Sequence, residues 1–173
     1  METLLDILQI TVPALMVFLA AFFTMRGMIR NDQDKRRQEI ILNNTKTITP
    51  IRLQAYERIV LFLERISLES LLVRTSSPGM SASQLHSAML TAIRSEFEHN
   101  LSQQIYMSQQ AWEVVKNARS NTLRFINTQF EAMNEKATAL EFSKQLLEKV
   151  MELDKEPTKT AIEYIKSEVA RMM

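Results

Sequence analysis

The sequence has no cysteine, two glycines and four prolines among its 173 residues. Without cysteine the chain has no disulfide, no thiolate nucleophile and no cysteine ligand for zinc. Gly27 and Gly79 are too far apart to form a phosphate-binding loop, which needs several glycines so that the backbone can approach the phosphate closely. The 21 basic and 20 acidic residues leave a net charge of +1. This balance gives no electrostatic reason to expect a nucleic acid as partner.

Patterns typical of catalysis and metal binding are equally scarce. A serine nucleophile needs a base that an acid orients, and neither of the two histidines, His86 and His99, lies in a recognisable nucleophile turn. Glu96 and His99 have the E-x-x-H spacing of di-iron bundles, but such sites need a second motif of this kind, and His86 has Ser83 three positions before it. We therefore expect no enzymatic activity, no metal and no cofactor. A small-ligand or metal-binding protein is the third-ranked interpretation.

Helix-forming residues dominate what remains. The sequence is rich in leucine, isoleucine, glutamate, lysine and glutamine and has 11 methionines, a composition typical of helical proteins. No run rich in valine, isoleucine or threonine alternates strictly between apolar and polar residues, so we expect no strand. The predicted fold is all-α, with one N-terminal transmembrane helix followed by a cytoplasmic bundle of about five helices.

Residues 7–25 carry no charge. As a helix these 19 positions would be about 28 Å long, close to the ~30 Å hydrocarbon core of a bilayer. The stretch is apolar on all sides, unlike a helix at the edge of a soluble core. Glu2 and Asp6 precede it, whereas a cleaved signal peptide begins with basic residues. We therefore expect residues 1–25 to be an uncleaved membrane anchor, in preference to a signal peptide or a buried soluble helix.

Basic residues follow this stretch and none precedes it. Because basic residues remain on the cytoplasmic side, the prediction is a single-pass membrane protein with its N-terminus outside and its C-terminal domain in the cytoplasm. Residues 26–48 are then a basic juxtamembrane helix or linker. The cluster of basic residues in this segment is predicted to be a topology signal and headgroup anchor. The alternative is specific recognition of anionic lipid, worth about 1 kcal/mol per basic residue near the surface. The five residues are Arg26, Arg30, Lys35, Arg36 and Arg37.

Residues 49–173 are predicted to form the cytoplasmic helical domain. Thr49 followed by Pro50 is a favourable helix start, with a cap and then a residue whose missing N–H is not needed. Apolar residues at 51, 55, 56, 59, 60, 62, 63 and 66 predict a well-buried face. Two capping-box patterns, and other favourable starting residues, predict further helix starts. These starts are at Ser67, Ser81 with Gln84, Ser108, Thr138 with Glu141, and Pro157.

Residues 99–107 are predicted to interrupt a helix that would otherwise run from 82 to 134. Asn100 is a plausible helix stop, and Ser102 and Ser108 prefer caps to helix interiors. An unbroken helix of that length would be unusual in a compact domain. If the chain breaks there, Ile105 and Tyr106 must either tuck under the bundle or form an apolar contact for a partner.

Two blocks of sequence resemble a known family. TPIRLQAYERIVLFLERI at 49–66 and IRSEFEHNLSQQIY at 93–106 look like an uncharacterised family of short, single-span proteins of Gram-negative bacteria. Members often place proline after the residue that matches Ser67, where this chain has Leu68. The resemblance implies a bacterial inner-membrane protein and supplies no activity, ligand or catalytic residue.

The expected function is therefore a non-enzymatic, membrane-tethered interaction or scaffolding protein. The alternative is a membrane-surface module that responds to anionic lipid, and it depends on the basic cluster. The expected partners are the lipid bilayer and another protein. A homo-oligomer is compatible with the sequence.

Overall fold

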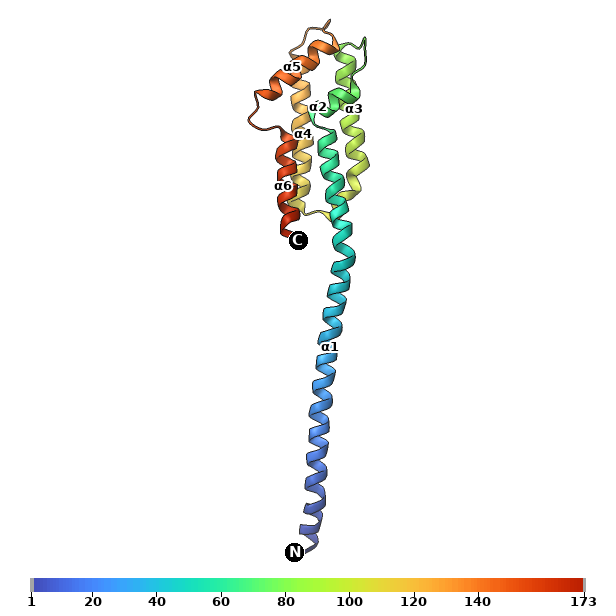
Figure 1. Cartoon of the computed structure of the whole chain (residues 1–173), viewed down its shortest axis with the longest axis vertical. Helices are drawn as coiled ribbons and strands as arrows, with labels where there is room; N and C mark the ends of the chain where they lie inside the picture. The colour runs from blue at the N-terminus through green and yellow to red at the C-terminus, as the bar shows by residue number, and fades with distance from the viewer. Residues whose placement is uncertain (1, 173) are drawn as a thin grey trace. The chain divides into compact units, whose positions relative to one another are not determined.

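The computed structural model describes the backbone of residues 2–172 (Figure 1). Side chains are described for residues 15–28, 33, 35, 36, 39, 42 and 46–172. This backbone contains seven helices and no strand, so the all-α prediction is confirmed. The helices are α1 (Glu2–Arg65), α2 (Leu68–Thr75), α3 (Ala82–Asn100), the 3₁₀ helix η1 (Leu101–Tyr106), α4 (Gln109–Glu131), α5 (Ala139–Met151) and α6 (Pro157–Met172).

The chain divides into two compact units between Thr49 and Pro50. The predicted helix start at these two residues is wrong, because α1 continues through them. Proline in a helix interior removes one backbone hydrogen bond and disfavours the preceding turn. The helix nevertheless continues, and the turns after Pro50 are held by side chains packed into the core, beginning with Ala55 and Tyr56.

The predicted membrane localisation is contradicted. Among the residues that the structure describes, no helix combines the length and the apolar character that a bilayer crossing requires. Side chains 7–14 of the predicted span lie outside the described residues. The prediction of a single-pass inner-membrane protein is therefore wrong.

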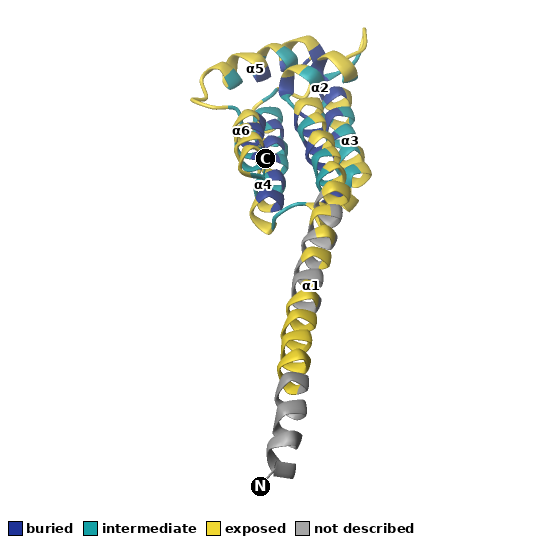
Figure 2. Ribbon diagram, turned by 60° about the horizontal axis from the view of Figure 1, so that its bottom comes forward, coloured by how far each residue is buried: buried dark blue, intermediate teal, exposed yellow. Residues whose placement is uncertain are grey.

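The second unit, residues 50–173, contains the hydrophobic core. Within it α4 packs against both α3 and α6, and α5 packs against α3 (Figure 1). Buried positions line the inward faces of the helices (Figure 2). The predicted buried face of α1 is largely confirmed, although Ile51 is exposed. The largest fully buried side chains are Tyr56, Ile59, Phe62, Leu63, Ile66, Leu71, Leu85, Met89, Ile93, Ile126, Phe142 and Leu146.

Helices α3 and α5 begin side by side. Both predicted capping boxes form, so Ser81 and Thr138 each accept a hydrogen bond from the third residue of their helix. The two cap residues also form an isolated antiparallel bridge, in which Ala82 N donates to Ala137 O at 3.0 Å and Ala139 N donates to Met80 O at 3.1 Å. Two helix starts 57 residues apart in the sequence are thereby held together. The predicted starts at Ser67, Ser108 and Pro157 are also confirmed.

Candidate functional site

The helical path from α3 to α4 is interrupted within residues 99–107, as predicted. Helix α3 ends at Asn100, whose side-chain Nδ2 donates to Glu96 O at 2.8 Å. The chain then forms η1 instead of an irregular loop, and Met107 is extended with φ −103° and ψ 161°. Ser108 begins α4 by accepting a hydrogen bond from Ala111 N at 3.0 Å. The cap-preferring residues around η1 therefore stop one helix and start the next.

The end of η1 is anchored to α1. Arg52 Nε donates a hydrogen bond to the carbonyl oxygen of Tyr106 at 3.1 Å. Such a bond satisfies one of the carbonyl groups that the end of a helix leaves without an intrahelical partner. Residues 54 positions apart are joined here, so the sequence gives no local signal of the contact. The backbone that carries Ile105 and Tyr106 is thus fixed against α1.

Ser108 also belongs to a polar cluster that joins three helices, formed with Tyr56 of α1 and Glu168 of α6. Tyr56 Oη donates to Glu168 Oε1 at 2.5 Å, and Ser108 Oγ donates to Glu168 Oε2 at 2.9 Å. Ser108 N donates to Tyr56 Oη at 3.4 Å. Burial and the hydrogen bond to the Glu168 carboxylate raise the pKa of Tyr56.

This Tyr56–Ser108–Glu168 cluster connects α1, the start of α4 and α6 through hydrogen bonds. Both hydroxyl protons are donated to the same carboxylate, and Ser108 Oγ also accepts the capping hydrogen bond. A serine nucleophile needs a base placed to take its proton and oriented in turn by a third group. Here a carboxylate with two hydroxyl donors takes that place, so the cluster holds helices together without the arrangement of a nucleophilic site. Sequence reasoning missed it, because its members lie up to 112 residues apart.

A groove lies between α1 and η1, with a volume of about 670 Å³. We call it the α1–η1 groove. It is lined by Ile51, Gln54, Ala55, Glu57, Arg58, Leu61, Ser102, Gln103, Ile105 and Tyr106. The predicted partner-contact residues therefore share one concavity, and neither tucks under the bundle: Ile105 is 72% exposed and Tyr106 is 38% exposed.

Apolar side chains from both helices gather in this groove. Ile51 and Leu61 of α1 are exposed large apolar residues, as is Ile105 of η1. Glu57 and Arg58 provide one acidic and one basic group beside them. Single exposed apolar residues are normal on a protein surface, whereas a cluster rimmed by polar groups is typical of a binding surface. The periodicity of α1 places Ile51 in the core, so the sequence alone missed this lining residue.

The predicted lipid-headgroup residues lie in the first unit, residues 1–49. Arg26, Lys35 and Arg36 are exposed there. The side chains of Arg30 and Arg37 are outside the described residues. Their contact with lipid headgroups stays a prediction.

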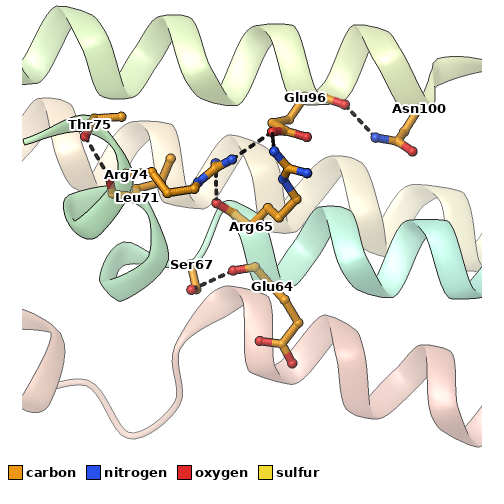
Figure 3. A network of polar contacts seen from close by, with 8 residues as sticks. All are labelled: Glu64, Arg65, Ser67, Leu71, Arg74, Thr75, Glu96 and Asn100. Carbon is orange, nitrogen blue, oxygen red and sulfur yellow. Dashed lines mark hydrogen bonds and ion pairs between the residues drawn. The ribbon is translucent and has the colours of Figure 1, made fainter.

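Glu96 of the E-x-x-H pattern belongs to a network of ion pairs. Glu96 pairs with two arginines, Arg65 NH2 at 2.8 Å and Arg74 NH1 at 2.9 Å, and Arg74 NH2 also donates to Arg65 O at 2.9 Å (Figure 3). His99, the other member of the pattern, is exposed. Among the described residues no three acidic or histidine side chains gather in a way that would hold a metal ion. Glu96 therefore joins α3 to the end of α1 and to α2.

The remaining histidine and the tryptophan belong to packed aromatic groups. His86 lies parallel to Phe130, with ring centroids 4.1 Å apart, and its Nε2 is 2.8 Å from Asn127 Oδ1. Trp112 is buried and stacks on Phe97, with ring centroids 5.6 Å apart. These rings stabilise the contact between α3 and α4.

Comparison with known proteins gives a family without an assigned role. No curated protein and no solved structure matches the chain. A family model described as a family of unknown function, DUF7935, matches residues 2–172. The resemblance of the sequence to an uncharacterised family is confirmed at this level. The chain belongs to the DUF7935 family of unknown function.

Proposed function

We propose that this protein is a non-enzymatic interaction protein, and that its second unit binds an amphipathic helix of another protein in the α1–η1 groove. The observation that carries this proposal is the exposure of Ile105 on a backbone fixed by the Arg52–Tyr106 hydrogen bond. An apolar side chain on a rigid support binds a partner without first being ordered, which reduces the entropic cost of association.

The shape and chemistry of the groove favour a helix as occupant. Ile51, Leu61 and Ile105 supply apolar side chains to the lining of the groove, and Glu57 and Arg58 supply charged ones. An amphipathic helix places apolar residues at positions i, i+3, i+4 and i+7 along one face and charged residues beside them. The apolar face of such a helix contacts Ile51, Leu61 and Ile105, and its flanking charged residues pair with Glu57 and Arg58.

The test is photocrosslinking in cells that produce the full chain. A photoreactive amino acid at position 105 should give a defined adduct with one other protein, because that side chain lies in the groove. The same amino acid at Asn121, an exposed position of α4 that does not line the groove, is the control. Leu61→Glu, added to the chain with the photoreactive residue at position 105, should remove the adduct, because it places a charge among the apolar residues that line the groove.

Two results would contradict the proposal. One is a set of adducts at position 105 that matches the set at position 121. The other is an adduct at position 105 that persists after Leu61→Glu. The melting temperature of each variant is measured in parallel, because a substitution at an exposed position should change the free energy of unfolding by no more than about 0.5 kcal/mol.

A further inference from the structure

Helix α5 has a second apolar stripe, separate from the face that packs into the core. Its buried residues are Ala139, Phe142 and Leu146. Leu140 and Met151 are 79% and 84% exposed, and Leu147 is also exposed (Figure 2 shows the exposed side of α5). A helix that is apolar on two sides has one face left for a partner.

The exposed stripe is narrow and straight. At 100° per residue, the positions 140, 144, 147 and 151 fall within about 60° of one another around the helix. Their spacing of four, three and four residues is that of a helix–helix contact seam. Lys144 lies in the middle of the stripe, and Glu148 lies one turn further along beside it. Both are highly exposed, with a distance of 3.8 Å between Lys144 Nζ and Glu148 Oε1.

We propose that two copies of this chain associate through α5, with the two helices antiparallel about a two-fold axis. In this register Leu140 of one copy contacts Met151 of the other, and Leu147 contacts the aliphatic part of Lys144. A two-fold axis requires that each contact occur twice, with the roles of the two copies exchanged. In an antiparallel pair of helices, the numbers of two facing residues always add up to the same value. The stripe meets this condition, because 140 and 151 add up to 291, as do 144 and 147.

The charges select the antiparallel arrangement. A parallel pair in register would place Lys144 against the same lysine of the second copy, which is unfavourable for like charges. In the antiparallel pair Lys144 of each copy lies beside Glu148 of the other. Residues on the same flank of two antiparallel helices face each other, so two intermolecular ion pairs replace the long contact within each chain.

The size of the surface predicts a weak association. Helix α5 has 13 residues, about 20 Å of length. One such helix face buries less than the roughly 1,200 Å² typical of stable complexes. We therefore expect a dimer whose population rises with concentration.

Disulfide formation between engineered cysteines tests the register, and the natural chain contributes no background because it has no cysteine. Two full-length chains are prepared, one with Leu140→Cys and one with Met151→Cys, carrying tags of different mass. Mixing them under mild oxidation should give the mixed disulfide as the main product. Each variant alone should give little disulfide, since its two cysteines would lie about 16 Å apart along the seam, beyond disulfide reach.

A charge exchange provides a second measurement that does not depend on cysteine. Lys144→Glu alone and Glu148→Lys alone should each weaken self-association about tenfold in sedimentation equilibrium, because two attractive contacts become repulsive. A mixture of the two variants should restore it, since every facing pair is then of opposite charge. Both substitutions are at exposed positions, and circular dichroism checks that each variant remains folded.

Three outcomes would overturn the proposal: disulfide formation that is as efficient in each single variant as in the mixture, no disulfide in the mixture, or charge variants that sediment as the natural chain does. The α1–η1 groove is not altered in these experiments. Their failure would therefore leave the proposed function standing, and failure of the crosslinking at position 105 would leave this inference standing.

Discussion

Tyr56 and Glu168 lie 112 residues apart in sequence and are joined by a hydrogen bond of 2.5 Å between Tyr56 Oη and Glu168 Oε1. The bond joins α1 to the last helix, and Ser108 at the start of α4 donates to the other carboxylate oxygen. The backbone that follows η1 thus ends in a cluster shared by three helices. This arrangement anchors the chain just after η1, which forms one wall of the α1–η1 groove.

Replacing Tyr56 with phenylalanine should lower the free energy of unfolding by about 1.5 kcal/mol, because a hydrogen bond to a charged group is lost. Chemical denaturation measures the change. The matched control is Tyr164→Phe, which removes an exposed hydroxyl 3.4 Å from Gln110 Oε1. We expect a change within about 0.5 kcal/mol for the control. Equal effects of the two substitutions would show that the Tyr56–Ser108–Glu168 cluster does not tie the helices.

The raised pKa of Tyr56 predicts a pH dependence at high pH. The protonated phenol is favoured in the folded state, so its stabilising contribution is complete below the ordinary pKa of 10.0 and is lost as the pH rises through the raised folded value. The free energy of unfolding should therefore fall more steeply above pH 10 in the natural chain than in Tyr56→Phe. Parallel curves for the two proteins would contradict this assignment.

Glu96→Gln should destabilise the protein by about 1–2 kcal/mol, because two guanidinium groups lose their shared carboxylate. Arg65 and Arg74 both contact Glu96 Oε1, and the Glu96 side chain is only 18% exposed. Glu98→Gln on the same helix changes an exposed carboxylate and serves as the control. Thermal unfolding at low and high salt measures both. An equal loss of stability in the two variants would mean that the ion pairs of Glu96 with Arg65 and Arg74 do not stabilise the fold.

Two isoleucines of the second unit should respond in opposite ways to alanine. Ile59 is fully buried, and its replacement should cost about 2–5 kcal/mol through lost packing and the cavity left behind. Ile105 is largely exposed, so its replacement should leave the melting temperature nearly unchanged while reducing partner capture. Denaturation curves of the two variants measure the contrast. A large loss of stability for Ile105→Ala would make it a core residue and remove it from the proposed binding surface.

Residues 46–173 should fold without the preceding segment. The described hydrophobic core lies between Tyr56 and Ile165, inside the second compact unit. At 128 residues the fragment exceeds the size below which a core becomes marginal. We expect a helical circular dichroism spectrum and a single cooperative thermal transition. A broad transition without near-ultraviolet signal would show that the core depends on residues 1–45 or on a partner.

The positions at which helices begin and end were largely predictable from the sequence. Ser81 with Gln84 and Thr138 with Glu141 form the expected capping boxes, and the interruption after Asn100 occurs where cap-preferring residues cluster. These features depend on side chains within three or four positions of each other, and that spacing is visible in the sequence. Pro50 is the exception, because α1 runs through it although Thr49 and the missing N–H of Pro50 favoured a helix start.

The predicted membrane span shows the limit of a composition argument, since the described part of α1 does not provide a helix suited to a bilayer. Contacts between side chains on different helices could not be predicted from the sequence either. Glu96 was part of a possible metal motif, and Arg65 and Arg74 pair with it only because α1, α2 and α3 meet there.

The sequence by itself therefore determined the helical class, the caps and most of the buried faces, because each depends on local spacing and on the transfer of apolar groups from water. The tertiary structure decided which polar groups share a site. The Tyr56–Ser108–Glu168 cluster and the α1–η1 groove both require helices that are distant in sequence to lie side by side, and their geometry follows from how the core packs.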